Sequence, residues 1–99
     1  DYALTTYQAE NVVQHYLFPS RIDLYINEKD LDKWHELMMK KGLYGKGNVK
    51  LIIAEDEHVM YGKRNINSLK IVSIPQLIID LKKEGGPCAE ASEMLIKRI

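Results

Sequence analysis

Residues 72–81 have the sequence VSIPQLIIDL, which contains the clearest helix start in the chain. Ser73 is a typical helix N-cap, Pro75 fits the first helical turn, and Gln76 takes the third position of a capping box. Apolar residues then recur at helical spacing and define a buried face, at Ile74, Leu77, Ile78 and Leu81. We therefore expect an amphipathic helix from residue 74 that ends at the Gly85-Gly86 pair.

A second helix is expected immediately after this one. Pro87 suits a first helical turn, and an apolar stripe continues to the end of the sequence through Ala91, Met94, Leu95 and Ile99.

The N-terminal part predicts a helix followed by a strand. After Thr5-Thr6, apolar side chains share one helical face to about Leu17, at Ala9, Val12, Val13 and Tyr16. Pro19-Ser20 interrupts this pattern, and residues 21–26 alternate strictly. Ile22, Leu24 and Ile26 would face the core, with Arg21, Asp23 and Tyr25 on the opposite face.

The middle of the chain predicts one helix and three strands. Asn27 to Asp30 resembles a helix start, and the apolar stripe beginning at Leu31 predicts a helix that ends near Lys41, before Gly42. Strands are expected at residues 49–54, 59–63 and 69–72. The order is then α, β, α, β, β, β, α, α. It indicates an α+β fold with a mixed, mostly antiparallel sheet of about four strands and helices packed against it.

Length and composition limit the function classes. The 99 residues form one domain, and fourteen basic residues balance fourteen acidic ones, so the chain lacks the positive field of a DNA-binding protein. A single cysteine excludes an internal disulfide, and the most apolar segment, residues 49–54, is far shorter than the ~20 residues of a membrane helix. We expect no membrane association and a cytoplasmic location.

Nucleophilic and metal-dependent chemistry receives little support. Cys88 lies among small residues at a helix start, where a packing role is the better interpretation. His15, His35 and His58 lack the i, i+4 spacing that aligns two metal ligands on a helix. No metal site and no cofactor are therefore expected.

Two stretches together resemble a known family. The first is Tyr2-Ala3-Leu4-Thr5-Thr6 followed by Pro-Ser-Arg-Ile-Asp-Leu-Tyr-Ile at residues 19–26. The second is residues 72–81 with Gly85-Gly86 and Ala89-Glu90-Ala91. They resemble the opening and the end of the effector half of type IV abortive-infection antitoxins, the AbiEi family and its archaeal relatives.

The resemblance implies a regulatory role. Residues 1–99 would be a single effector-type domain from a longer chain, whose N-terminal winged-helix domain would bind DNA. Such a transcriptional regulator or antitoxin acts by protein contact with a nucleotidyltransferase-type toxin, or by self-association. DNA would be contacted only through the N-terminal domain.

The same opening resembles a weakened nucleotidyltransferase pattern, in which a small-residue helix start precedes a strand carrying two aspartates. Here the helix start is Thr5-Thr6, and the strand has Arg21 where the first aspartate belongs, followed by Asp23. Transfer of this kind requires paired carboxylates that hold Mg²⁺. Glu55 could stand in the place of a third acid, but it does not restore the pair. We therefore expect a nucleotidyltransferase-like fold without enzymatic activity.

Six residues are candidates for a partner or nucleotide surface: Thr5, Thr6, Arg21, Asp23, Tyr25 and Asp80. Asp23 has a simpler interpretation as an exposed strand residue, and Asp80 is as readily a solvated or salt-bridged acid. The alternative function is a minimal nucleotidyltransferase-like enzyme or a nucleotide-binding domain. Six tyrosines suit a surface that is half buried against a partner, although a mixed core would use them equally well.

Overall fold

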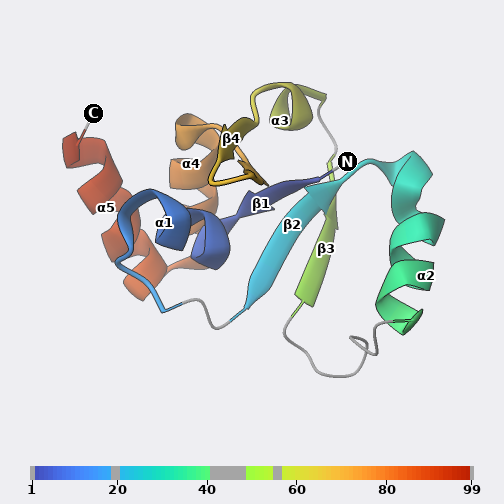
Figure 1. The fold of residues 1–99 in the computed structure, drawn as a ribbon. Coiled ribbons are helices and arrows are strands. Elements are labelled where there is room, and N and C mark those ends of the chain that lie inside the picture. Colours follow the sequence, from blue (N-terminus) through green and yellow to red (C-terminus); the bar gives the residue numbers. More distant parts are fainter. Residues whose placement is uncertain (1, 19–20, 41–48, 55–56, 99) are drawn as a thin grey trace.

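The computed structural model describes residues 2–18, 21–40, 49–54 and 57–98, and it contains a five-stranded sheet with helices packed against it (Figure 1). The elements, in chain order, are β1 (Ala3–Thr5), α1 (Thr6–Gln14), β2 (Ile22–Ile26), the 3₁₀ turn η1 (Glu28–Asp30), α2 (Leu31–Lys40), β3 (Val49–Ile53), α3 (Glu57–Tyr61), β4 (Arg64–Ile66), β5 (Leu69–Ile71), α4 (Ile74–Glu84) and α5 (Pro87–Arg98). The α+β class with a mixed sheet is confirmed.

The strand order is β3-β2-β1-β5-β4, so the first strand of the sequence lies at the centre. β1 runs antiparallel to β2 and parallel to β5, while β2 and β3 are parallel and β4 and β5 antiparallel. Two of the four pairings are thus parallel. The expectation of about four, mostly antiparallel strands is wrong on both points.

The additional strand is β1, in residues that were expected to lead directly into a helix. Three residues are too few to show an alternating pattern, so no local signal marks them as a strand. Their pairing is decided by distant partners: Leu4 lies opposite Leu24 on β2 and opposite Ile71 on β5. Ala3, Leu4 and Thr5 are all buried as a result.

Residues 59–63, expected to form a strand, belong mainly to the short helix α3. The apolar run is too short to distinguish the two structures by periodicity. Met60 packs into the core from this helix, and Gly62 donates its N–H to the carbonyl of His58 at 3.0 Å. The strand that pairs with β5 is instead β4, at Arg64–Ile66.

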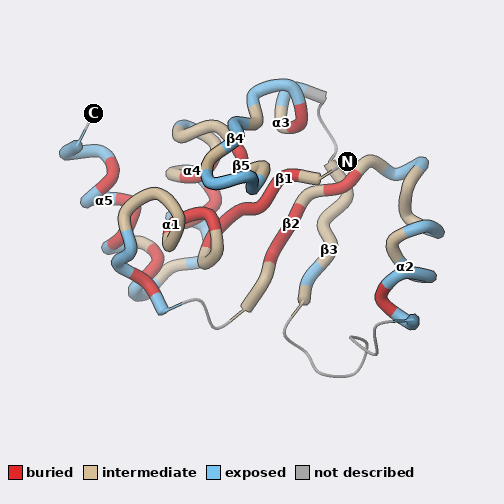
Figure 2. The backbone as a smooth tube through the Cα atoms, in the orientation of Figure 1, coloured by how far each residue is buried: buried red, intermediate tan, exposed pale blue. Residues whose placement is uncertain are grey.

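The two expected C-terminal helices are present, but Met94 of the expected apolar stripe is 39% exposed and Ile99 lies outside the described residues. Ser73 caps α4 by accepting the N–H of Gln76 at 3.4 Å, and Gly85, with φ at +79°, ends it. α4 packs against α5, and the buried residues Leu77, Leu81 and Leu95 join the core from these helices. Buried segments run through β1, β2 and the inner sides of α4 and α5 (Figure 2).

The connection after α1 is held by a buried carboxylate. α1 ends at Gln14, three residues before the expected end near Leu17, because His15 adopts a left-handed φ of 59°. Glu10 is fully buried and accepts the backbone N–H of Tyr16 at 3.2 Å and of Leu17 at 2.7 Å. The expected break at Pro19-Ser20 lies outside the described residues, as does the expected end of the next helix at Lys41-Gly42.

The β4–β5 hairpin provides a test of the backbone geometry. Its two turn residues, Asn67 and Ser68, have positive φ values of 53° and 66°, which the primed turns of tight hairpins require. A non-glycine residue in this region destabilises the folded state through steric contacts of its Cβ atom.

We predict that Ser68→Gly raises the free energy of unfolding by about 0.5–1 kcal/mol in urea denaturation. Ser68→Ala, the matched control, should give no gain, and a destabilised Ser68→Gly would contradict the prediction.

Candidate functional site

All six candidate residues lie together where α4 crosses one face of β1 and β2. Thr5 on β1 is opposite Asp23 on β2, and Tyr25 lies two residues further along the same strand face. Thr6 starts α1, and Asp80 comes from the middle of α4. The side chains form two hydrogen-bonded groups, one around each aspartate.

The first group surrounds Asp80, which is 8% exposed. Its carboxylate accepts the hydroxyl of Thr5 at 2.6 Å, the hydroxyl of Tyr25 at 2.9 and 3.0 Å, and the amide N–H of Gln76 at 3.0 Å. The interpretation of Asp80 as a solvated or salt-bridged acid is therefore wrong, since neighbouring Lys82 pairs with Glu93 on α5 instead. Asp80 joins α4 to both central strands.

The second group surrounds Asp23, which is 1% exposed. Arg21 donates from Nε to Oδ1 and from Nη2 to Oδ2, both at 2.7 Å, and Thr6 donates its hydroxyl to Oδ2 at 2.6 Å. Arg21 Nη2 also reaches Glu84 Oε1 on α4 at 2.9 Å. The expectation that Asp23 is an exposed strand residue is wrong, because helices cover this face of β2 and bury the acid, while the partly exposed Arg21 pairs with it from the edge.

Electrostatics in this group keep the guanidinium of Arg21 in its charged form. The hydrogen bonds to Asp23 are the main reason why the pKa of Arg21 lies above its ordinary value, with burial acting in the opposite direction. Arg21 also lies over the ring of Tyr7, 5.3 Å from the ring centroid. This geometry anchors the guanidinium on three sides.

The hydroxyls of Thr5 and Thr6 each donate a hydrogen bond to a buried carboxylate, and Thr5 does not cap α1. Thr5 occupies the N-cap position of α1 but makes no side-chain cap hydrogen bond, because its hydroxyl points to Asp80. Thr6 has a φ of 47°, a costly value for a β-branched residue. In this conformation the Thr6 hydroxyl donates a hydrogen bond to Asp23, and this buried hydrogen bond offsets the backbone strain.

Sequence reasoning missed two members of the site. Gln76 and Glu84 lie four residues on either side of Asp80, so the three side chains follow one face of α4. This i, i+4, i+8 polar stripe is visible in the sequence, beside the apolar face that was recognised. This spacing could have indicated, from the sequence alone, that α4 has a polar edge facing the sheet.

The site was compared with the other residues that could hold a metal ion. Within residues 2–18, 21–40, 49–54 and 57–98, no group of three His, Cys, Asp or Glu side chains could hold a metal ion. The residue of β3 that pairs with Asp23 is Lys50. Glu55, the expected third acid, lies outside the described residues.

Cys88 is fully buried, as expected for a packing residue. Burial raises the pKa of its thiol, which disfavours the nucleophilic thiolate. A hydrogen bond with Cys88 also raises the pKa of Tyr7. The pair therefore packs beneath Arg21 in the uncharged state at neutral pH.

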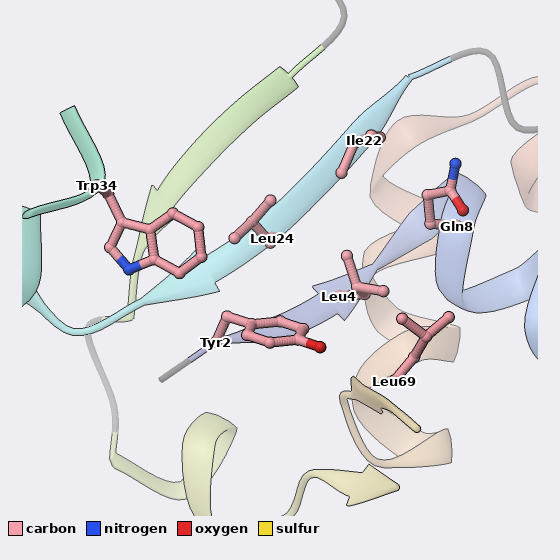
Figure 3. A pocket seen from close by; sticks show the side chains of 7 residues that line it. All are labelled: Tyr2, Leu4, Gln8, Ile22, Leu24, Trp34 and Leu69. Carbon is pink, nitrogen blue, oxygen red and sulfur yellow. The ribbon is translucent and has the colours of Figure 1, made fainter. Parts of the chain in front are cut away.

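The other face of the central strands carries an apolar groove of about 310 Å³ (Figure 3). Tyr2 and Trp34 meet edge to face there, with ring centroids 6.2 Å apart. The groove is lined by Tyr2, Leu4, Gln8, Ile22, Leu24, Trp34 and Leu69. None of these side chains is charged, so the two faces of the sheet differ sharply in chemistry.

Comparison with protein-family models, with curated proteins and with solved structures found no match to this chain. The likeness to the antitoxin family therefore rests on the quoted sequence motifs. No helix within the described part of the chain is long and apolar enough to cross a lipid bilayer.

Removing the cation tests whether Arg21 neutralises Asp23. We predict that Arg21→Met lowers the free energy of unfolding by about 3 kcal/mol, because it leaves a buried carboxylate without its partner. Urea denaturation measures this change. Lys83→Met removes an exposed lysine on α4 and should change stability by less than about 0.5 kcal/mol.

A double-mutant cycle then separates the pair from general damage. The double variant with Asp23→Asn and Arg21→Met should lose less free energy of unfolding than the two single variants lose together. We expect the difference, the coupling energy, to be about 1.5–3 kcal/mol. Additive losses would contradict direct neutralisation.

The Tyr25–Asp80 contact predicts a loss of stability in alkali. Burial, followed by the charge of Asp80, raises the pKa of Tyr25 in the folded chain. A tyrosine in the unfolded chain loses its proton near pH 10. The stabilisation that protonated Tyr25 gives to the folded state is therefore complete below about pH 10 and decreases as the pH rises above it. Denaturation at several pH values should show wild type more stable than Tyr25→Phe by about 1.5 kcal/mol at pH 8, with the difference narrowing above about pH 10. A constant difference up to about pH 11.5 would refute this assignment.

Proposed function

We propose that this chain is a non-enzymatic regulatory domain, which acts by protein contact as the effector part of a transcriptional regulator or antitoxin of the type IV kind. The observation that supports the absence of catalysis is the bidentate contact of Arg21 with Asp23. A catalytic metal would need the negative charge of Asp23, and that charge is already compensated by a fixed guanidinium.

The arrangement around Thr6 supports a nucleotidyltransferase-like fold for this domain. The residues resembling the family's helix start and strand aspartate are 17 positions apart in the sequence, yet the Thr6 hydroxyl contacts Asp23 directly. We interpret this as a site geometry that has been kept while its chemistry was replaced. Asp23 and Asp80 then hold α4 on the sheet instead of holding a substrate.

The proposed partner is a nucleotidyltransferase-type toxin, with self-association as the second mode of contact. DNA would be bound by a separate winged-helix domain of the longer chain, since this domain carries equal numbers of acidic and basic residues. Such a regulator would act in the cytoplasm.

Co-expression tests the proposal. The chain is produced together with a nucleotidyltransferase-type toxin of the type IV kind, and the two are followed through size-exclusion chromatography with light scattering. We expect one co-eluting complex and relief of the growth arrest that the partner alone causes. Separate elution with unrelieved arrest would contradict the toxin-binding function, and a concentration-dependent mass of the chain alone would favour self-association.

Calorimetry with Mg²⁺-ATP tests the alternative of a nucleotide-binding enzyme. The wild-type chain should show no saturable heat, and Asp23→Asn, checked for folding by circular dichroism, should behave identically. Saturable binding by the wild type that disappears in Asp23→Asn would instead favour the alternative.

A further inference from the structure

We propose that a depression bordered by Arg64 and Arg98 receives an acidic side chain of the protein partner. This inference rests on the proposed function, since it names the surface through which the domain contacts another protein. The depression has a volume of about 220 Å³ and lies where α1, α4, α5 and the edge strand β4 meet (Figure 1). Its lining consists of Val13, Arg64, Ile74, Leu95 and Arg98.

The three arginines of the chain differ in their surroundings. Arg21 is paired with Asp23 and Glu84. Arg64 on β4 and Arg98 at the end of α5 are far apart in the sequence, yet both line this depression. Among the residues that the structure describes, neither forms an ion pair with a carboxylate, and no acidic side chain lines the depression. An anion placed between these two cations would be stabilised by both.

The guanidinium of Arg98 is positioned by a neutral group. Its Nη1 donates to Oε1 of Gln14 at 3.5 Å, and Nε2 of Gln14 donates to the carbonyl oxygen of Ala91 at 3.0 Å. The amide orients the guanidinium without neutralising its charge. The other N–H groups of Arg98 are thus directed to further acceptors, and a carboxylate matches the planar fork of a guanidinium through two parallel hydrogen bonds.

The floor and the size of the depression favour a protein side chain over other anions. Leu95 is 3% exposed, and Val13 and Ile74 are partly buried beside it. These aliphatic groups suit the methylene groups of a glutamate and an apolar neighbour in the same partner segment. The volume is below the ~300–1,000 Å³ of pockets that hold drug-sized ligands, and the balanced charge of the chain disfavours nucleic acid. Arginine is also enriched among the residues that dominate the binding energy of protein interfaces.

A peptide titration tests the site without the partner. The probe is an acetylated and amidated tripeptide with glutamate between two leucines, and its neutral counterpart carries glutamine instead. Each is added to the isotope-labelled chain at constant ionic strength, and the backbone amide signals of Val13 and Leu95 are followed. We expect saturable shifts with a dissociation constant of about 1–10 mM, and about fivefold tighter binding of the glutamate peptide. The indole signal of Trp34, which lines the groove on the other face of the sheet, should not move.

Single substitutions locate the charge that the peptide recognises. Arg64→Met and Arg98→Met should each weaken the glutamate peptide about threefold and leave the affinity for the glutamine peptide unchanged. Lys83→Met is the matched control, because it removes the same charge from an exposed position of α4 outside the depression. It should retain affinity within about 1.5-fold. Urea denaturation verifies that each variant is folded.

The complex with a nucleotidyltransferase-type toxin of the type IV kind separates this inference from the proposed function. Arg64→Glu combined with Arg98→Glu should weaken the complex by about tenfold or more, and the affinity of the wild type should fall as salt is added. A wild type that binds the toxin as tightly as the double variant does would overturn the inference and leave the function standing. A wild type that binds the glutamate peptide but not the toxin would contradict the proposed function and support the acid-binding site. Equal affinity for the two peptides, or equal effects of Arg64→Met, Arg98→Met and Lys83→Met, would also overturn the inference.

Discussion

The fold depends on two buried aspartates that are satisfied entirely by the chain itself. Asp80 connects α4 to β1 through Thr5 and to β2 through Tyr25. Asp23 accepts hydrogen bonds from Arg21 and Thr6. Buried carboxylates are costly unless they are paired and hydrogen-bonded, so the contacts of Asp80, together with the Arg21–Glu84 ion pair, stabilise the observed placement of α4 on the sheet. The same contacts fix the junction between β1 and α1, where adjacent threonines serve different acids. The position of the central strand and that of the helix above it are therefore coupled.

This coupling divides the sheet into two chemically different faces. On the α4 face, polar groups are concentrated and none of the buried side-chain nitrogen or oxygen atoms in the described residues lacks a hydrogen-bond partner. On the opposite face, Leu4 and Leu24 lie at the base of an open apolar groove. A polar network closed against α4 is suited to holding structure, and a concave apolar surface is suited to receiving another molecule.

The six candidate residues lie together, but their burial could not be predicted from the sequence. Thr5, Thr6, Arg21, Asp23, Tyr25 and Asp80 were selected from sequence motifs, and they do meet in space. Their burial could not be predicted, because alternation along β2 shows which residues share a face and not what covers that face. Glu84 was missed for a related reason: its contact with Arg21 joins residues 63 positions apart. The only local indication of this role of Glu84 was the regular spacing of polar residues on α4.

The sequence by itself determined the elements with strong local signals. The Ser73 cap, the Gly85 stop and the alternation of residues 22–26 each depend on interactions within a few residues, so α4, α5 and β2 were predictable. Only the tertiary structure decided β1, the helical state of residues 57–61, and the parallel pairings of β1 with β5 and of β2 with β3. These segments are short, so their local preferences are weak. Their conformation follows from hydrogen bonds and burial supplied by partners far away in the chain, which is information that no local pattern contains.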